Sequence, residues 1–236
     1  MEARYDGVAD FYAAGWPDDL DDPASTCLFA LLGPVAGQRV LEIACGHGRV
    51  SRELARRGAS VAAVDISGEL IGKALAAERD RPLGIRYTHA DAAEPGLLAG
   101  EAFDAVVCCF GLSDIDDLDG TLDTVGRTLR PGGLFVWSIL HPCFAGGAGI
   151  SGSWPTGGRY HDEGWWRADG EQSTLRRQVG AHHRMLATYL NAVRRHGMTV
   201  DEVAEPDPEW DADRADAARS PVYLIVRCVR RKSSPQ

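Results

Sequence analysis

The stretch from Val40 to Ser67, VLEIACGHGRVSRELARRGASVAAVDIS, constrains the fold more than any other part of the chain. It holds two short apolar runs with β-branched residues, and between them lie a glycine-rich turn and a segment with apolar residues at helical spacing. The runs predict buried strands, and the spacing predicts a helix that ends at Gly58. A strand, a helix and a second strand in this order indicate a parallel βαβ unit, in which both strands end at the same edge of a sheet.

The same alternation of apolar runs and helical spacing continues along the chain. Further strands are predicted at residues 83–91, 103–112, 133–140, 198–206 and 221–230, and further helices at 68–80, 117–130 and 182–197. The predicted fold class is therefore α/β, a Rossmann-like three-layer sandwich around a mostly parallel seven-stranded sheet. The last two strands are expected to form an antiparallel hairpin at one edge of that sheet.

Length and composition favour a single domain. A chain of 236 residues, 44% of them hydrophobic, buries one substantial core, so residues 1–236 are expected to form one unit. Residues 1–33 are predicted to be an N-terminal helical cap. Residues 141–180 combine glycines with tryptophans and tyrosine and start with a long stretch without periodicity, which is typical of an inserted lid or binding loop.

Charge and cysteine usage narrow the classes of partner. The formal net charge of −9 repels phosphate backbones, which argues against nucleic acid as a partner. No apolar run is long enough to cross a membrane, and the N-terminus lacks a signal-peptide pattern, so a cytoplasmic protein is expected. The six cysteines show no CxxC spacing, which predicts reduced thiols and no metal site. Nothing in the sequence indicates an oligomeric state.

The glycine turn and two acidic residues predict a small-molecule site. Gly46 and Gly48 let a ligand approach the backbone closely where the first strand turns into a helix. Asp65 ends the second strand, where an acid accepts hydrogen bonds from the hydroxyls of an adenosine ribose. Glu42, near the end of the first strand, suits a cationic amine. An NAD-dependent oxidoreductase is the weaker alternative, because the dinucleotide motif needs a third glycine where this chain has Ser51.

The motifs from about residue 5 to residue 140 resemble the class I S-adenosylmethionine-dependent methyltransferases. The resemblance rests on ordered segments, which are YDGVADFY, VLEIACGHGRVSRELA, VAAVDIS, THADAAE, FDAVVCCFGLSDI and LRPGGLFVWSI. It implies S-adenosylmethionine as the cofactor, with S-adenosylhomocysteine as the product. It also implies a set of cofactor-binding residues, namely Tyr12, Glu42, Ala44, Gly46, Gly48, Asp65, Ile66, Asp91, Ala92 and Cys109.

Two residue types in that set have plainer explanations. Tyr12 is expected to close over the donor from the N-terminal helix, but Tyr5, Val8 and Tyr12 are also spaced like an ordinary packing face. Cys45 and Cys109 are interpreted as small residues lining the site rather than as nucleophiles, because methyl transfer to a small molecule needs no covalent enzyme intermediate.

The acceptor is expected to be a small molecule of specialised metabolism, methylated on oxygen, nitrogen or carbon. The fourth strand ends in CCFGLSD, which departs from the NPPY-like ending of relatives that methylate amino groups of adenine or glutamine. The main alternative is a protein of this fold that binds the donor but does not methylate.

The loop at residues 141–180 supplies the candidate acceptor residues. Together with the segment that follows, it gives Trp154, Tyr160, Trp165, Trp166 and His183 as substrate-binding candidates, unless the tryptophans only pack the loop onto the domain. His141 directly follows the fifth apolar run, and it is predicted to accept or orient the proton of the acceptor. The alternative is that His141 bonds to backbone and shapes the loop.

Overall fold

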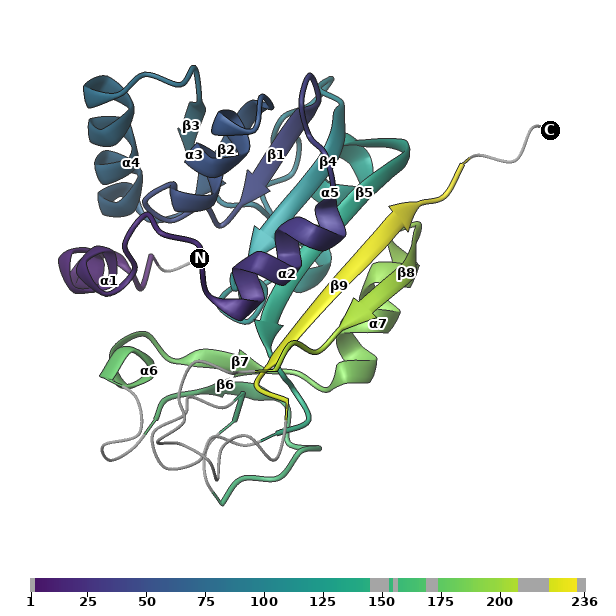
Figure 1. The fold of residues 1–236 in the computed structure, drawn as a ribbon. Coiled ribbons are helices and arrows are strands. Elements are labelled where there is room, and N and C mark those ends of the chain that lie inside the picture. Colours follow the sequence, from purple (N-terminus) through teal and green to yellow (C-terminus); the bar gives the residue numbers. More distant parts are fainter. Residues whose placement is uncertain (1–2, 145–152, 155–156, 169–173, 208–220, 233–236) are drawn as a thin grey trace.

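A seven-stranded sheet forms the centre of the protein (Figure 1). The structure is a computed structural model, and it describes residues 3–144, 153–154, 157–168, 174–207 and 221–232. The strands are ordered β3-β2-β1-β4-β5-β9-β8. Neighbours among the first five are parallel, and β9 is antiparallel to both β5 and β8. This arrangement confirms the predicted fold class. The strands are β1 (Arg39–Ile43), β2 (Ser60–Asp65), β3 (Arg86–His89), β4 (Phe103–Cys109), β5 (Leu129–Leu140), β8 (Met198–Ala204) and β9 (Tyr223–Arg230).

Helices cover both faces of the sheet. One face packs against α2 (Pro23–Leu32), α3 (Arg49–Arg56) and α4 (Gly68–Asp80), and the other against α5 (Leu118–Thr128) and α7 (Leu186–Arg195). Successive side chains of a strand point to opposite faces, so the adjacent Val40 and Leu41 of β1 belong to the two different core clusters. Both residues are fully buried. The sheet therefore carries a core on each face, as its continuous apolar strands require.

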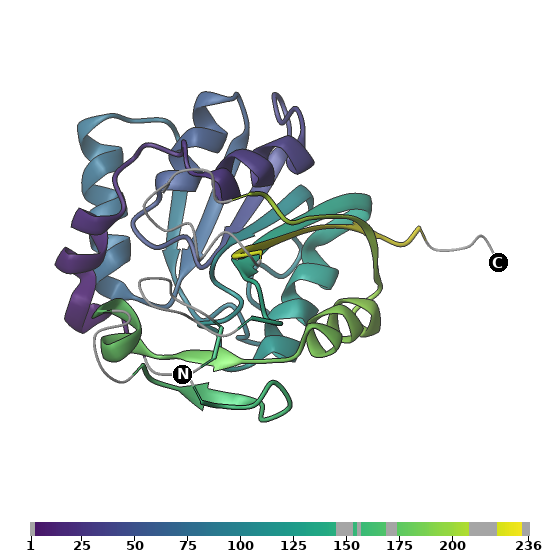
Figure 2. The ribbon, with the colours of Figure 1, turned by 60° about the horizontal axis from the view of Figure 1, so that its bottom comes forward.

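The edge at which the parallel strands end carries the remaining elements (Figure 2). A two-stranded hairpin of β6 (Gly164–Trp166) and β7 (Ala181–His183), with the short α6 (Thr174–Val179), lies along this edge. On the side of α4, a 3-10 turn (Asp6–Val8) leads into α1 (Ala9–Gly15). In parallel sheets of this type, ligands bind at the edge where the strands end.

Several predicted boundaries are wrong, and at two helices the causes are tertiary. The predicted helix 117–130 ends at Thr128 instead, because Leu129 already pairs with Phe103, and a register shift before Ala105 accommodates the Pro-Gly-Gly turn inside β5. The predicted helix from residue 182 starts only at Leu186. His182 lies in β7, where its amide donates to the Ser113 carbonyl oxygen at 2.7 Å.

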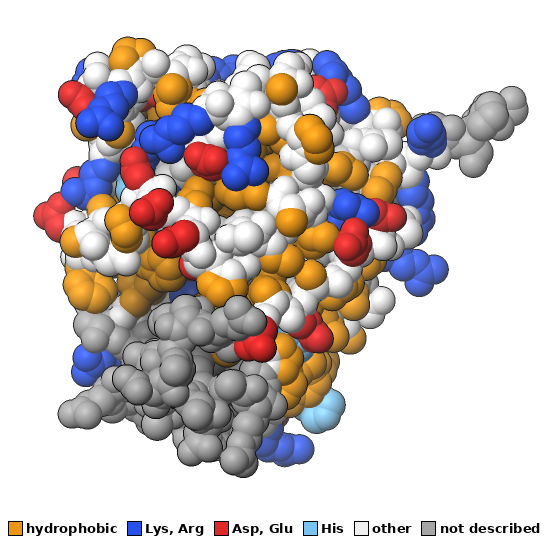
Figure 3. Space-filling view, in the orientation of Figure 1, with side chains coloured by type: hydrophobic (Ala, Val, Ile, Leu, Met, Phe, Trp, Pro, Cys, Tyr) orange, Lys and Arg blue, Asp and Glu red, His pale blue; other side chains and the backbone are white. Residues whose placement is uncertain are grey.

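The surface carries charges of both signs. Figure 3 shows lysine and arginine side chains interspersed with aspartate and glutamate on the face that carries α2 and β9. All six cysteines are free thiols. Among the described residues, no helix has the length and apolar character needed to cross a bilayer.

Candidate cofactor and acceptor site

The turn after β1 has the backbone of a ligand cradle. Ala44, Gly46 and Gly48 adopt positive φ angles of 55°, 55° and 86°. A Cβ atom at position 48 would lie 2.4 Å from the Tyr87 hydroxyl, so only glycine fits there without displacing the tyrosine. Gly48 also caps α3, whose first amides have no partner within the helix. The turn therefore presents backbone donors at the end of β1.

Asp65 ties the end of β2 to this turn. Its Oδ2 accepts a hydrogen bond from the Gly46 amide at 2.7 Å, and its Oδ1 accepts one from the Ser67 amide at 2.8 Å. Burial raises the pKa of Asp65, and the two amide donors oppose that shift. Each carboxylate oxygen keeps a further lone pair, so Asp65 has acceptor capacity left for the hydroxyls of a ribose.

Glu42 is the next-to-last residue of β1, just before the glycine turn, and it is only 2% exposed. The Ser51 hydroxyl donates a hydrogen bond to Glu42 Oε2. Ser51 stands where a dinucleotide motif has its third glycine, and here it serves the carboxyl group instead. Burial raises the pKa of Glu42 to about 8, and the bond from Ser51 opposes this shift. A nearby cation would favour the ionised form of this side chain.

The N-terminal segment packs directly on the glycine turn. The ring of Tyr12 borders Gly46, and a Cβ atom added there would lie 3.5 Å from it. His47 donates through Nε2 to the Trp16 carbonyl oxygen at 3.0 Å, and Arg52 donates to the His47 carbonyl oxygen at 2.6 Å. Burial raises the pKa of Tyr12, so its hydroxyl is neutral at ordinary pH. The placement of Tyr12 suits both the predicted contact with the donor and simple packing.

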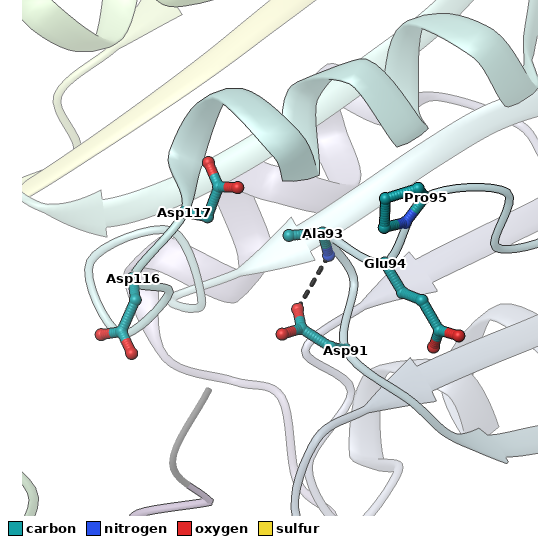
Figure 4. A pocket seen from close by; sticks show the side chains of 6 residues that line it. All are labelled: Asp91, Ala93, Glu94, Pro95, Asp116 and Asp117. Carbon is teal, nitrogen blue, oxygen red and sulfur yellow. Dashed lines mark hydrogen bonds between the residues drawn. The ribbon is translucent and has the colours of Figure 1, made fainter.

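Three more of the predicted cofactor-binding residues, Ile66, Asp91 and Ala92, follow the ends of β2 and β3. Asp65 and His89 are partners in the parallel pairing, and His89 Nε2 donates to the carbonyl oxygen of Ile66 at 2.9 Å. Asp91 Oδ1 accepts from the Ala93 amide at 2.8 Å, which shapes the turn after β3. Asp91 also borders a cavity of about 450 Å³ (Figure 4), whose other lining residues are Ala93, Glu94, Pro95, Asp116 and Asp117.

Cys109 ends β4 next to the glycine turn that follows β1. Burial raises its pKa to about 12, and Ser138 lies next to it with a 3.6 Å separation between Oγ and Sγ. A neutral, half-buried thiol is a poor nucleophile, which supports the packing interpretation. Two residues later, a Cβ atom at Gly111 would lie 2.4 Å from the Cβ of Ala44. The turns after β1 and β4 are therefore in close contact.

The loop that follows β4, Leu112 to Asp117, anchors two distant segments of the chain, which no sequence pattern predicted. Asp114 accepts hydrogen bonds from the Tyr5 hydroxyl, at 2.7 Å, and from Arg176. Asp116 accepts from Arg4 and from His182, both at 2.7 Å. The N-terminal segment and the α6–β7 segment are thus anchored on the same loop. The acids are visible in the sequence, but their partners lie too far along the chain to be paired by pattern.

Three of the five acceptor candidates, Trp154, Tyr160 and His183, form one cluster of rings. The His183 ring lies 5.8 Å from each of the rings of Trp154 and Tyr160, and its Nε2 donates to the Tyr160 carbonyl oxygen at 2.8 Å. The Trp166 indole donates to Ser153 at 2.9 Å. Trp165 is separate and 43% exposed, and the guanidinium groups of Arg4 and Arg167 lie over its ring. Part of the 141–180 segment lies outside the described residues, and the acceptor role of these side chains stays a prediction.

Both ring nitrogens of His141 have partners. Its Nδ1 accepts from the Cys143 amide at 3.2 Å, so the proton of the neutral ring sits on Nε2, which donates to Glu205 at 2.7 Å. The ring is buried against Phe144. His141 would have to release one of these partners to take a proton from an acceptor. The predicted role of His141 as a base therefore stays a proposal.

Comparison with known proteins agrees with the α/β fold. Residues 41–137 match a family described as a methyltransferase domain. A demethylmenaquinone methyltransferase of Clavibacter sepedonicus is 38% identical over 107 residues, which are 44% of this chain and 42% of the relative. A ubiquinone biosynthesis O-methyltransferase of Xylella fastidiosa is 38% identical over 109 residues, which are 45% of this chain and 44% of the relative. The chain thus spans less than half the length of these two curated relatives.

A solved structure matches over almost its whole length. The crystal structure of an S-adenosylmethionine-dependent methyltransferase from Mesorhizobium loti is 31% identical, with a TM-score of 0.71, and the match covers 89% of this chain and 99% of that one. The chain belongs to the class I S-adenosylmethionine-dependent methyltransferases, and S-adenosylmethionine is its cofactor. The residues present fit this group, because the glycine turn presents backbone donors at the end of β1 and the Asp65 carboxylate keeps free lone pairs. This family membership replaces the alternative of an NAD-dependent oxidoreductase.

Proposed function

We propose that the protein transfers the methyl group of S-adenosylmethionine to an oxygen, nitrogen or carbon atom of a small molecule, leaving S-adenosylhomocysteine. The observation that carries this proposal is the bond between the Asp65 carboxylate and the Gly46 amide, which sets an acid and a glycine turn side by side at the ends of two parallel strands. The buried Glu42 completes the cradle.

The side chains around the glycine turn would position the cofactor and keep water away from it, and they would not react with it. When bound, the cofactor supplies a methyl group on a cationic sulfur, a carbon that needs only an aligned nucleophile. Asp65 would hold the ribose hydroxyls, and Glu42 would face the cationic methionine portion. Tyr12 would shield the glycine turn from water, since it already packs on Gly46. Alignment and exclusion of water supply much of the acceleration in such displacements.

A small acceptor is favoured over a macromolecule. The two curated relatives are named for steps with demethylmenaquinone and in ubiquinone biosynthesis, which makes quinone precursors the first acceptors to test. The formal net charge of −9 disfavours nucleic acid. A base is needed only for an acceptor that is protonated at neutral pH, and His141, paired with Glu205, is the proposed candidate.

The test is a screen with labelled donor and a panel of phenol, amine and carboxylic acid acceptors. A product heavier by one methyl group supports the proposal. The alternative, a protein of this fold that binds the donor without methylating, predicts calorimetric binding of S-adenosylhomocysteine but no methylated product from any acceptor. Absence of binding would remove both proposals.

A further inference from the structure

A row of aromatic rings runs along the edge where the parallel strands end. Tyr12, Trp16, Phe110 and Tyr223 follow one another with ring centroids 6.3, 6.4 and 5.7 Å apart. The rings come from the N-terminal segment, the end of β4 and the start of β9, so the fold brings together three distant parts of the chain. The row begins on the glycine turn, because Tyr12 packs against Gly46. It therefore leads away from the expected place of the donor.

The backbone of Phe110 is held in an uncommon conformation. Its φ angle is 58°, in the left-handed region that non-glycine residues rarely adopt. The Phe110 amide donates to the Ser138 carbonyl oxygen at 2.9 Å, and the next residue, Gly111, is pressed against Ala44. Contacts on both sides thus fix the turn and aim the ring. Such a strained conformation persists only where the surroundings enforce it, often at ligand sites.

Partial exposure distinguishes these rings from the core. Trp16 is 36% exposed, and Phe110 and Tyr223 are half-buried, whereas Cys108, two residues before Phe110, is completely buried. The guanidinium of Arg49 lies 5.4 Å from the centre of the Trp16 ring, so this part of the row is flanked by a cation. Flat, partly exposed rings beside a donor cradle favour a ligand that is itself flat and apolar.

We infer that Phe110, with Trp16 and Tyr223, selects a planar aromatic acceptor by stacking against its ring. The inference rests on the proposed function, which supplies the donor at the glycine turn. Phe110 is the specificity-determining residue, because it is the central ring of the three and directly follows Cys109 at the end of β4. A saturated molecule of the same size and polarity has no π-face to stack and binds more weakly.

The experiment compares 2-naphthol with decahydro-2-naphthol, which carries the same hydroxyl group on a saturated skeleton. Calorimetry measures the binding of each probe to the intact protein, saturated with S-adenosylhomocysteine. The unmodified protein is expected to prefer 2-naphthol. Phe110→Leu keeps an apolar side chain but removes the flat ring, and should weaken 2-naphthol binding roughly three- to tenfold without changing the affinity for the saturated probe.

Phe11→Leu is the matched control, because Phe11 is a half-exposed ring on α1 that takes no part in the row. It should change neither affinity. If Phe110→Leu does not fold, Trp16→Leu makes the same test at a more exposed ring. Failure of S-adenosylhomocysteine to bind would overturn the proposed function and the inference with it. Normal binding of S-adenosylhomocysteine, with equal affinity for the two probes or no loss in the variant, would overturn the inference alone.

Discussion

The Asp65 carboxylate accepts a hydrogen bond from the Gly46 amide at 2.7 Å, and this contact joins the end of β2 to the turn after β1. The same carboxylate bonds the Ser67 amide, at the start of α4. One buried side chain therefore shapes the turns after two strands and also offers acceptor atoms to a ligand. Its substitution should affect both roles, and different measurements separate them.

Asp65→Ala is expected to weaken the binding of S-adenosylhomocysteine about tenfold to a hundredfold, because charge-assisted hydrogen bonds contribute roughly 1.5 to 3 kcal/mol. Calorimetric titration measures this loss, and thermal unfolding measures the structural share. Asp80→Asn, an exposed acid at the end of α4, is the control and should leave affinity unchanged. Equal affinities for Asp65→Ala and the unmodified protein would exclude Asp65 from the site.

Glu42 should make the stability of the ligand-free protein fall as pH rises. The ordinary pKa of 4.5 holds in the unfolded chain, whereas burial raises the folded value to about 8. Above pH 4.5 the unfolded state releases the proton and the folded state keeps it, so the free energy of unfolding falls until about pH 8 and is then level. The loss should be on the order of 5 kcal/mol, because one pKa unit corresponds to about 1.4 kcal/mol.

Urea unfolding of the Glu42→Gln variant between pH 4.5 and 9 tests this dependence. The variant cannot ionise at position 42, so the part of the pH dependence that comes from this residue should disappear. Glu69→Gln, at an exposed position in α4, should keep the profile of the unmodified protein. Parallel profiles for Glu42→Gln and the unmodified protein would show that Glu42 is ionised in the folded state.

Asp116→Asn is expected to loosen two segments at once, because Asp116 accepts hydrogen bonds from both Arg4 and His182. Hydrogen exchange should become faster at residues 3–8 and at residues 181–184 together. Asp119 offers a matched control, since it also pairs with an arginine and a histidine, Arg195 and His196, but on an exposed helix surface. A response of Asp116→Asn in only one of the two segments would contradict their common anchorage.

His141→Ala is expected to lower the single-turnover rate at least about a hundredfold, if His141 is the general base, and to leave donor affinity nearly unchanged. Glu205→Gln separates this role from a structural one, because it keeps the shape of the partner while removing its charge. A base oriented by Glu205 should then show a changed pH dependence of the rate. Rates within a few-fold of the unmodified enzyme for both variants would leave His141 with a structural role.

The cofactor side of the site could be predicted because it is local in sequence. Glu42, Gly46 and Gly48 lie within one strand and its turn, and Asp65 ends the next strand of the same βαβ unit. A parallel βαβ unit brings its strand ends together whatever the rest of the chain does. Strand runs and glycine turns are also the strongest patterns in a sequence.

The acceptor side could not be predicted in the same way, because tertiary contacts decide it. His183 follows a region without periodicity, and its strand β7 forms by pairing with β6 and by a bond from its neighbour to the loop after β4. The position of Phe110 beside Trp16 and Tyr223 depends on three segments far apart in the chain. No pattern of spacing relates such residues before the chain has folded.

The insertion of β9 between β5 and β8 sets an order of assembly during synthesis. Strand β8 leaves the ribosome before the only neighbour it has in the described sheet, because β9 is made later. Until residues 223–230 emerge, the nascent sheet ends at β5, and Val136 lacks Ile225, the buried residue that joins its core cluster. An open apolar edge of this kind attracts other strands. The nascent chain should therefore be prone to association at this edge until β9 is in place.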